Sequence, residues 1–272
     1  MSKDQKSLPL FQHALNSPSA FTPESRLEAV RTERDLPRAP VPEICVLEFD
    51  GDLTDWLVGT GLATRWHPWA CFHTSMETVE VDGERVGVIA RTIGGPYAVL
   101  VAEQLAASGV RVILGLTSAG QVSPGLEIPS LVIPTTAIRD EGTSYHYLPA
   151  AESVDGDAGL ARALQAELGG LGLPVVTGPV WTTDAPYRET AEQLAQHARD
   201  GILAVEMQAA SLFAFSAARG VRCSVVAYVT NGIDHSSEAQ FDKGTHQFGF
   251  EILKAMARAG RRCPTPRLRP PL

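Results

Sequence analysis

The stretch Val112-Ile-Leu-Gly-Leu-Thr-Ser-Ala-Gly120 joins an apolar run of strand length to a turn of small and hydroxyl residues. Short apolar runs bounded by turn residues are typical of buried strands. In α/β domains ligands gather where such strands end, because backbone N–H groups in glycine-rich turns can approach them there. We therefore predict a strand at 112–116 and a ligand-contacting turn after it, with a plain connecting loop as the alternative.

Similar apolar runs recur along the chain and alternate with helical segments. The predicted strands are residues 44–49, 86–92, 112–116, 131–136, 175–182 and 223–230; the predicted helices are residues 96–108, 159–168, 189–199, 205–219 and 245–259. Strands that alternate with helices of this length indicate a three-layer α/β domain with a parallel or mixed sheet.

Composition divides the chain into three predicted parts. Residues 1–42 are polar, end in a Pro-rich stretch and suit an N-terminal arm and linker. Residues 43–262 hold the predicted domain, and residues 263–272, CPTPRLRPPL, form a Pro-rich C-terminal tail that cannot continue a helix.

Charge and composition exclude several classes of protein. The 272 residues are 44% hydrophobic, which is enough for a sizeable core, and the net charge of −8 disfavours binding to nucleic acid or anionic lipid. No apolar run is long enough to span a bilayer and the first residues lack a signal-peptide pattern, so we expect a soluble, cytoplasmic protein with no membrane partner. The four cysteines form no C-x-x-C pair, which argues against a disulfide framework or a zinc site.

Three further segments carry residue types that suit chemistry. Ile93-Gly-Gly-Pro-Tyr97 leaves free amides before a predicted helix, although a tight turn needs glycines too. Gly178–Thr190 places an indole, a carboxylate, a phenol and a guanidinium within eight residues, with helix capping as the alternative. In Ala204–Ala210 a carboxylate and an amide flank a methionine. A charge at the start of a helix would explain the carboxylate but not the whole cluster.

Together these segments resemble the nucleoside phosphorylase superfamily, which includes uridine and purine nucleoside phosphorylases and nucleosidases. The resemblance covers residues 43–258 and rests on these pieces: the Gly-Gly-Pro turn with Glu103-Gln-Leu105, Thr117-Ser-Ala-Gly120, Arg139–His146, Thr183-Asp184 and Val205-Glu-Met-Gln208. It implies an α/β fold of three layers, in which a central mixed sheet closes into a distorted barrel flanked by helices. It also implies homodimers, or hexamers built from dimers, in which a neighbouring subunit completes each site.

The resemblance implies cleavage of the N-glycosidic bond of a purine or pyrimidine nucleoside. Phosphate or water attacks the anomeric carbon, and free base leaves. No metal or organic cofactor is implied, and inorganic phosphate is the co-substrate if the reaction is phosphorolytic. The expected partner is a small-molecule nucleoside or base.

The segments and the resemblance assign candidate roles by position. Base-binding residues are Thr117, Ser118, Gly120, Trp181, Asp184, Tyr187 and Arg188; ribose-binding residues are Glu206, Met207 and Gln208; anion-binding residues are Gly94, Gly95, Ser118 and Arg139; catalytic residues are Asn231 and Asp234. Trp181 is expected to form an open pocket wall that stacks on the base.

The chain departs from the family pattern at three functions. Gln208 replaces a ribose-binding Glu, and Asn231 replaces an Asp that protonates the base, a task that an amide cannot perform. Asp234 could substitute for it, or be a solvated turn residue. Asp55 and Gly115 stand where the family has phosphate-binding arginines.

No arginine in His73–Glu77 matches the neighbour-supplied one of the family. A conventional phosphate site is therefore not expected, unless Arg65, Arg91, Arg139 or Arg188 has taken over.

Three functions follow from these observations. The first is a phosphorylase-like enzyme that cleaves nucleosides. The second is a phosphate-independent nucleosidase, and the third is a non-catalytic protein of the same fold that binds or stores nucleosides.

Overall fold

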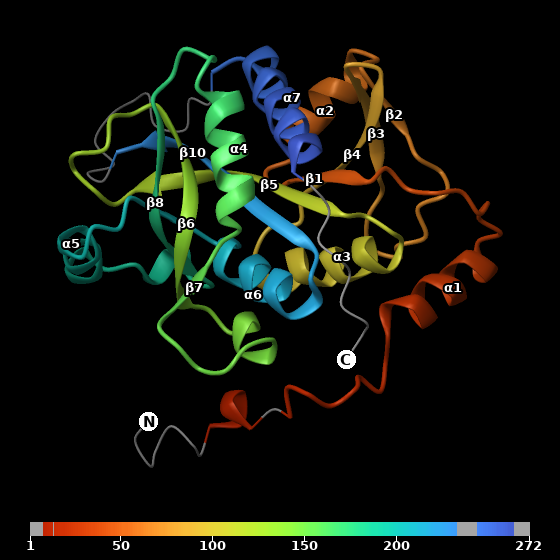
Figure 1. The fold of residues 1–272 in the computed structure, drawn as a ribbon, viewed down its shortest axis with the longest axis horizontal. Coiled ribbons are helices and arrows are strands. Elements are labelled where there is room, and N and C mark those ends of the chain that lie inside the picture. Colours follow the sequence, from red (N-terminus) through yellow and green to blue (C-terminus); the bar gives the residue numbers. More distant parts are fainter. Residues whose placement is uncertain (1–7, 13, 233–243, 264–272) are drawn as a thin grey trace.

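The computed structural model describes residues 8–12, 14–232 and 244–263 of the chain. Within these ranges ten strands form one sheet with helices on both faces (Figure 1). The strands are β1 (Ile44–Glu48), β2 (Ala63–Arg65), β3 (Glu77–Val81), β4 (Glu84–Ala90), β5 (Val112–Gln121), β6 (Ser130–Asp140), β7 (Ser153–Asp155), β8 (Val175–Thr183), β9 (Ala204–Glu206) and β10 (Arg222–Asn231). The α-helices are α1 (Pro23–Glu33), α2 (Asp52–Gly59), α3 (Gly95–Ala107), α4 (Ala158–Leu168), α5 (Ala191–Arg199), α6 (Ala209–Arg219) and α7 (His246–Arg262), and the short 3-10 turns are η2 (Pro9–Phe11), η3 (Thr143–His146) and η4 (Pro186–Arg188).

Five strands close into a barrel. Strand β5 pairs with β9, β9 with β8, β8 with β6, β6 with β10, and β10 again with β5. The β5–β9 and β6–β10 pairs are antiparallel and the other three are parallel. Beyond β5 the sheet continues as an open wing through β1, β4, β3 and β2. The predicted α/β fold with a mixed sheet that closes into a distorted barrel is confirmed.

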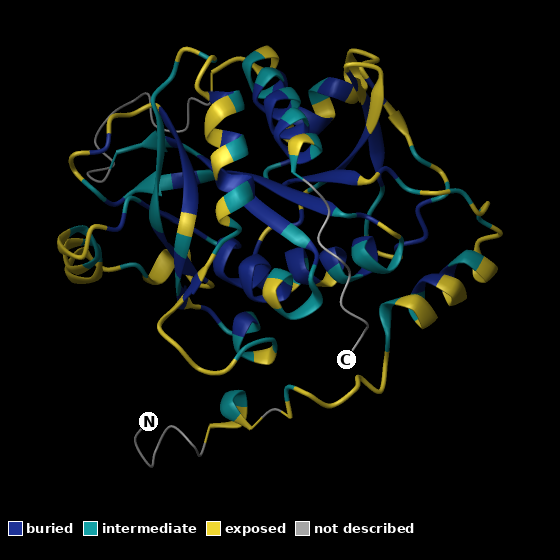
Figure 2. Cartoon of the chain, in the orientation of Figure 1, coloured by how far each residue is buried: buried dark blue, intermediate teal, exposed yellow. Residues whose placement is uncertain are grey.

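Two apolar cores lie on opposite faces of this sheet. One contains side chains of α3 and α6, and the other contains side chains of α2, α4 and α7 (Figure 2). Helix α1 covers part of the first face, because Leu27 and Val30 are buried. No α-helix in the described ranges is long and apolar enough to cross a membrane.

The predicted boundaries are wrong in two places that matter for the site. Residues 117–120, predicted as a turn after a strand at 112–116, continue strand β5 to Gln121. Val205 and Glu206, predicted as the start of a helix at 205–219, belong to β9, and α6 begins only at Ala209. The three residues of β9 pair with β5 on one side and with β8 on the other. A strand this short cannot show the alternation by which strands are found in a sequence.

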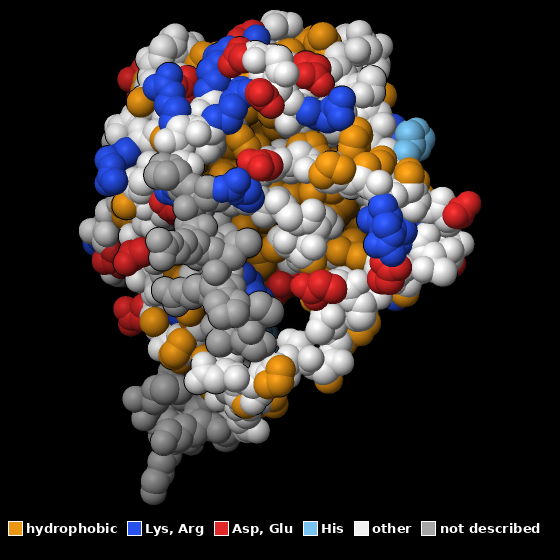
Figure 3. Space-filling view, turned by 45° about the vertical axis from the view of Figure 1, so that its right-hand side comes forward, with side chains coloured by type: hydrophobic (Ala, Val, Ile, Leu, Met, Phe, Trp, Pro, Cys, Tyr) orange, Lys and Arg blue, Asp and Glu red, His pale blue; other side chains and the backbone are white. Residues whose placement is uncertain are grey.

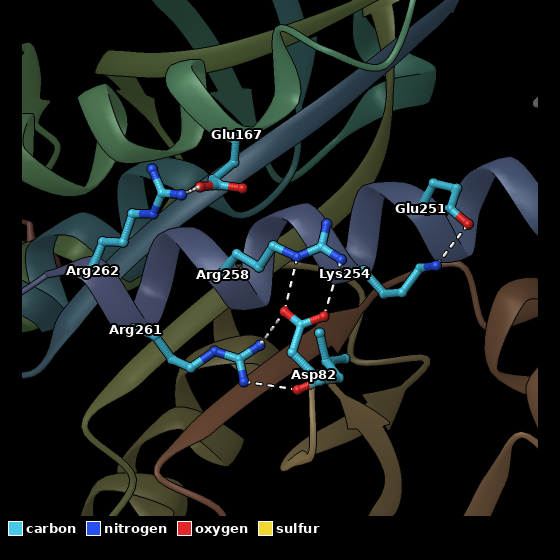
Figure 4. A network of polar contacts seen from close by, with 8 residues as sticks. Asp82, Glu167, Glu251, Lys254, Arg258, Arg261 and Arg262 are labelled. Carbon is cyan, nitrogen blue, oxygen red and sulfur yellow. Dashed lines mark hydrogen bonds and ion pairs between the residues drawn. The ribbon is translucent and has the colours of Figure 1, made fainter.

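Charged side chains fasten α7 across the open wing of the sheet (Figure 4). Arg258 and Arg261 donate to Asp82, which lies in the turn between β3 and β4, and Arg262 pairs with Glu167 of α4. Asp82 and Gly83 both have positive φ, as a two-residue hairpin turn requires. The network connects α7 to the β3–β4 hairpin and to α4.

Candidate active site

Residues from four barrel strands stand in one row across the sheet. Asn231 of β10 pairs with Gly120 of β5, Gly120 with Val205 of β9, and Val205 with Trp181 of β8. Residues paired in this way point to the same face of a sheet. The register therefore brings together three segments that the sequence predicted to meet.

Gly120 is the one residue of this row without a side chain. A Cβ atom built at this position would lie 3.2 Å from the Cγ1 atom of Val205, a tight contact. A larger residue at position 120 would therefore crowd Val205.

Trp181 is buried, and the expectation that it forms an open wall is wrong. Only 1% of the residue is exposed. Its indole N–H donates to Asp140 at 3.0 Å, and its ring lies 4.4 Å from the imidazole of His197 on α5, centroid to centroid. Helix α5 covers this face of β8 and buries Trp181. The residue pattern of β8 alone does not indicate this cover.

Glu206 lies on the opposite face of the barrel wall from Trp181 and caps a helix. Its Oε2 atom accepts the backbone N–H groups of Gln208 and Ala209, at 2.6 and 2.8 Å, and its Oε1 atom accepts the hydroxyl of Thr182 at 2.5 Å. These are the unpaired N–H groups at the start of α6. Both oxygens of Glu206 therefore serve the chain itself, and a ribose hydroxyl would have to share them with these internal donors.

Gln208 is 1% exposed and joins three of the predicted segments. With its amide oriented to satisfy both ends, the nitrogen donates to Glu206 at 3.2 Å and the oxygen accepts the N–H of Gly94 at 3.1 Å. The hydroxyl of Thr117 lies 3.4 Å from the same amide. Met207, which is partly exposed, stands between Glu206 and Gln208.

Burial raises the pKa of Glu206 to about 7, although its three hydrogen bonds oppose the shift. A second buried carboxylate, Glu141, raises this pKa further and accepts the hydroxyl of Ser211 at 2.5 Å. Gly95 packs against Ser211 so closely that an added Cβ would lie 2.1 Å from its hydroxyl oxygen. Gly95 is therefore needed for close packing, and its predicted role as an anion ligand has no support in this contact.

Ser118, one of the donors expected to bind an anion, and two residues of the segment that follows β1 donate to carboxylates of the chain. Ser118 donates its backbone N–H and its hydroxyl to Asp50, at 3.2 and 3.0 Å. Glu48 accepts the N–H of Gly51 at 2.8 Å and both the N–H and the hydroxyl of Thr54. Burial raises the pKa of Glu48. A bound anion would have to compete with these internal acceptors.

Three of the four arginines considered as replacements are engaged, whereas Arg188 is exposed and lines one of the cavities described below. The guanidinium of Arg139 donates to the hydroxyl of Ser144 and to the carbonyls of Leu148 and Pro149, so it holds the turn at 143–149 and a bound anion would have to compete with these acceptors. Arg91 donates through both terminal nitrogens to Asp55, which lowers the pKa of that carboxyl.

Other candidates follow the same pattern. Arg65 pairs with Glu77 on the open wing of the sheet. Gly115 has no room for a side chain, since a Cβ there would lie 2.8 Å from the ring of Phe49. Position 115 therefore cannot hold the family's arginine while Phe49 is in place.

Two cavities border the barrel at the ends of its strands. One, of about 520 Å³, is lined by Thr117 and Ser118 together with Glu48, Asp50 and Asp52, and no Lys or Arg is among its described lining residues. The other, of about 470 Å³, is lined by Trp181, Asp184 and Arg188 with Arg139.

Two further candidates are not among the described residues that line either cavity. Tyr187 is fully exposed. Asp234 lies outside the described residues. Within the described part of the chain, no three His, Cys, Asp or Glu side chains are grouped to hold a metal.

Several residues of the site were not predicted from the sequence. The fold gives hydrogen-bond partners to three of them, which are Asp50, Glu48 and Thr182. The fourth, His197, contacts Trp181 because α5 packs on β8. One signal was available for two of them. Glu48 is the last residue of an apolar strand and Asp50 lies two residues beyond it, at the strand end where ligands gather in α/β domains.

Replacing Trp181 by Ala is expected to lower the free energy of unfolding by about 3–5 kcal/mol, because it removes a large buried ring and leaves a cavity. Tyr187→Ala, in the same segment but fully exposed, should change it by less than about 0.5 kcal/mol. Urea unfolding of both variants measures the difference. Equal, small effects would show that Trp181 is not a core residue.

Glu206 should make stability depend on pH. An unfolded glutamate loses its proton near pH 4.5, whereas native Glu206 keeps it to about pH 7, so the folded chain holds more protons between these values. Stability contributed by this group therefore falls as pH rises from 4.5 to 7 and levels off above. Urea unfolding at several pH values should show this slope in the parent and in the control Glu127→Gln, and a weaker slope in Glu206→Gln. Equal slopes in all three would contradict the assignment.

Comparisons with known proteins agree with this architecture. The model of the Phosphorylase superfamily matches residues 51–262. Uridine phosphorylase of Salmonella typhimurium is 26% identical over 195 residues, which cover 66% of this chain and 77% of that protein.

Two other relatives match shorter stretches. Guanosine phosphorylase of Halorubrum lacusprofundi is 28% identical over 156 residues, 56% of this chain, and the match spans 63% of that protein, less than two thirds of its length. A DeoD-type purine nucleoside phosphorylase of Myxococcus xanthus is 32% identical over 142 residues, 52% of this chain and 59% of that protein. With the closed barrel and a family match over most of its length, the chain belongs to the phosphorylase superfamily.

Proposed function

We propose that this protein is an enzyme that cleaves the N-glycosidic bond of a nucleoside. The observation that carries the proposal is the row of Trp181, Val205, Gly120 and Asn231, which combines a flat aromatic side chain, a glycine and an amide at one end of the barrel. The names of the relatives, which are uridine, guanosine and purine nucleoside phosphorylases, support the same reaction class.

In the proposed reaction an oxygen nucleophile attacks C1′ of the sugar while the bond from C1′ to the base nitrogen breaks. The bonding electrons leave with the base, which then takes up a proton. The sugar passes through an oxocarbenium-like state, which polar groups around it must stabilise. Met207 and Gln208 are the proposed sugar contacts, and Asn231 is proposed to donate a hydrogen bond to the departing base.

Asn231 limits how the leaving group is activated. A carboxamide donates a hydrogen bond but releases no proton near neutral pH. The base therefore obtains its proton from water or from another side chain. We expect bases that leave readily as anions, or that are protonated in solution, to be the better leaving groups.

Water is a second candidate for the nucleophile, and a specific observation favours it. Glu48, Asp50 and Asp55 already accept the hydrogen bonds of Gly51, Ser118 and Arg91 that an incoming phosphate would need. Each missing charge-assisted contact weakens an anion site by about ten- to a hundredfold. Phosphate is then a weak acceptor, and hydrolysis competes with phosphorolysis.

We also propose that two copies of the chain associate through the face that carries α3. Exposed apolar side chains lie there, with Ile93 54% and Leu100 42% exposed, beside a cavity of about 760 Å³ that Phe21, Pro96 and Leu100 help to line. Figure 3 shows hydrophobic side chains gathered on the side of the molecule turned forward. Contiguous apolar surface of this kind is typical of an interface.

A panel of purine and pyrimidine nucleosides, incubated with and without phosphate, tests the reaction. We expect release of free base, with half-saturation by phosphate only above about 1 mM, the range in which a site with so few anion contacts binds. Asp55→Asn should lower that concentration by freeing Arg91, and the exposed Asp200→Asn should not.

The other outcomes of this assay are equally informative. Saturation at sub-millimolar phosphate in the parent would contradict the weak-acceptor account. Absence of base release from every nucleoside would favour a protein that only binds them.

Sedimentation velocity tests the association. The parent is expected to sediment as a dimer or a larger assembly, and Leu100→Glu should shift it to the monomer because a buried charge is costly. Val58→Glu on α2 introduces the same charge at a residue that is 49% exposed and distant in the sequence, and should leave the assembly intact. A monomeric parent at all concentrations would refute the proposal.

A further inference from the structure

Helix α5 is the least embedded helix of the barrel region. None of its residues is buried, and Figure 2 shows it mostly exposed at the edge of the molecule. Leu194, His197 and Ala198 are its partly buried residues, and they face the row residues Trp181 and Val205. Segments with so few buried contacts open at low free-energy cost.

The connection from β8 to α5 is equally open. All residues from Asp184 to Arg188 are exposed. Helix α5 is held together by its own capping box, in which Thr190 and Gln193 exchange hydrogen bonds. The helix can therefore keep its fold while its position on the barrel changes.

His197 occupies the face of Trp181. The two rings lie 4.4 Å apart with a tilt of 35°, a separation typical of stacked aromatic groups. Asp140 fixes the indole from its edge by accepting its N–H at 3.0 Å. The indole plane is thus held in place, and an imidazole covers it.

We propose that His197 fills the place of the heterocycle in the ligand-free protein, and that a purine or pyrimidine base displaces it as α5 swings outward. This inference rests on the proposed function, since it takes Trp181 as the surface on which the base stacks. It resolves the conflict between that role and the burial of Trp181, because the indole becomes accessible only when His197 leaves. His197 then sets the affinity for the base without touching the reacting atoms.

Binding measurements on three variants test this inference. His197→Ala removes the competing ring, so the Kd for free base and the KM for nucleoside should fall about two- to tenfold, as expected for loss of one stacked pair, with kcat unchanged. His197→Phe keeps a stacking ring without a titratable nitrogen and should bind no more tightly than the parent. Gln196→Ala, an exposed neighbour on the same helix, is the control and should behave as the parent.

Two results would overturn the inference. Weaker binding by His197→Ala would mean that the imidazole supports the ligand instead of competing with it. A loss of kcat with KM unchanged, reproduced in His197→Phe, would mean that the imidazole serves the chemical step.

Acrylamide quenching of Trp181 fluorescence gives a readout that needs no activity. The Trp181 signal is the difference between each protein and its Trp181→Phe counterpart. Quenching of this signal should increase in His197→Ala and decrease again when free base is added. Unchanged quenching in His197→Ala would refute the covering role. If no nucleoside or base binds to any variant, the proposed function fails, while the quenching of the ligand-free proteins still decides whether His197 covers the indole.

Discussion

The three residues of β9 determine how the rest of the site is arranged. Ala204–Glu206 pair with β5 and β8 at once and so close the barrel. The strand then ends in Glu206, whose buried carboxyl accepts the first N–H groups of α6. One short segment thereby sets the wall that carries Val205, the start of the helix and the position of Met207. This arrangement buries the carboxyl group of Glu206, and the burial raises its pKa to about 7.

The positions of the strands β1, β4, β5, β6, β8 and β10 along the chain could be predicted from the sequence, because their apolar runs are distinct. β9 could not, since three residues show no period, and its residues read as the beginning of α6. The segments that meet at the site were identified by their residue types, whereas the direction of each side chain was not. Trp181 and Glu206 were both expected to face the ligand, yet the strand register sends them to opposite faces. The direction of each side chain depends on the register of the whole sheet, which cannot be inferred from the residues of one strand.

Charge compensation within the chain explains the departures from the family pattern. Asp55, where the resemblance implies an arginine, has its charge met by Arg91, which follows the end of β4. Asp50 and Glu48 likewise accept from loop donors that a free anion would use. The hydrogen-bonding capacity of the loops after β1 and β5 is thus satisfied internally. The sequence shows that these positions hold no arginine. It does not show that nearby carboxylates accept the hydrogen bonds of the surrounding donors.

A crystal structure with a nucleoside or its free base tests the central claim most directly, namely that the heterocycle binds on the row from Trp181 to Asn231. The account predicts the heterocycle stacked on Trp181, the imidazole of His197 moved away, and the sugar beside Met207. A ligand bound in another cavity, with the contact between Trp181 and His197 intact, would contradict it.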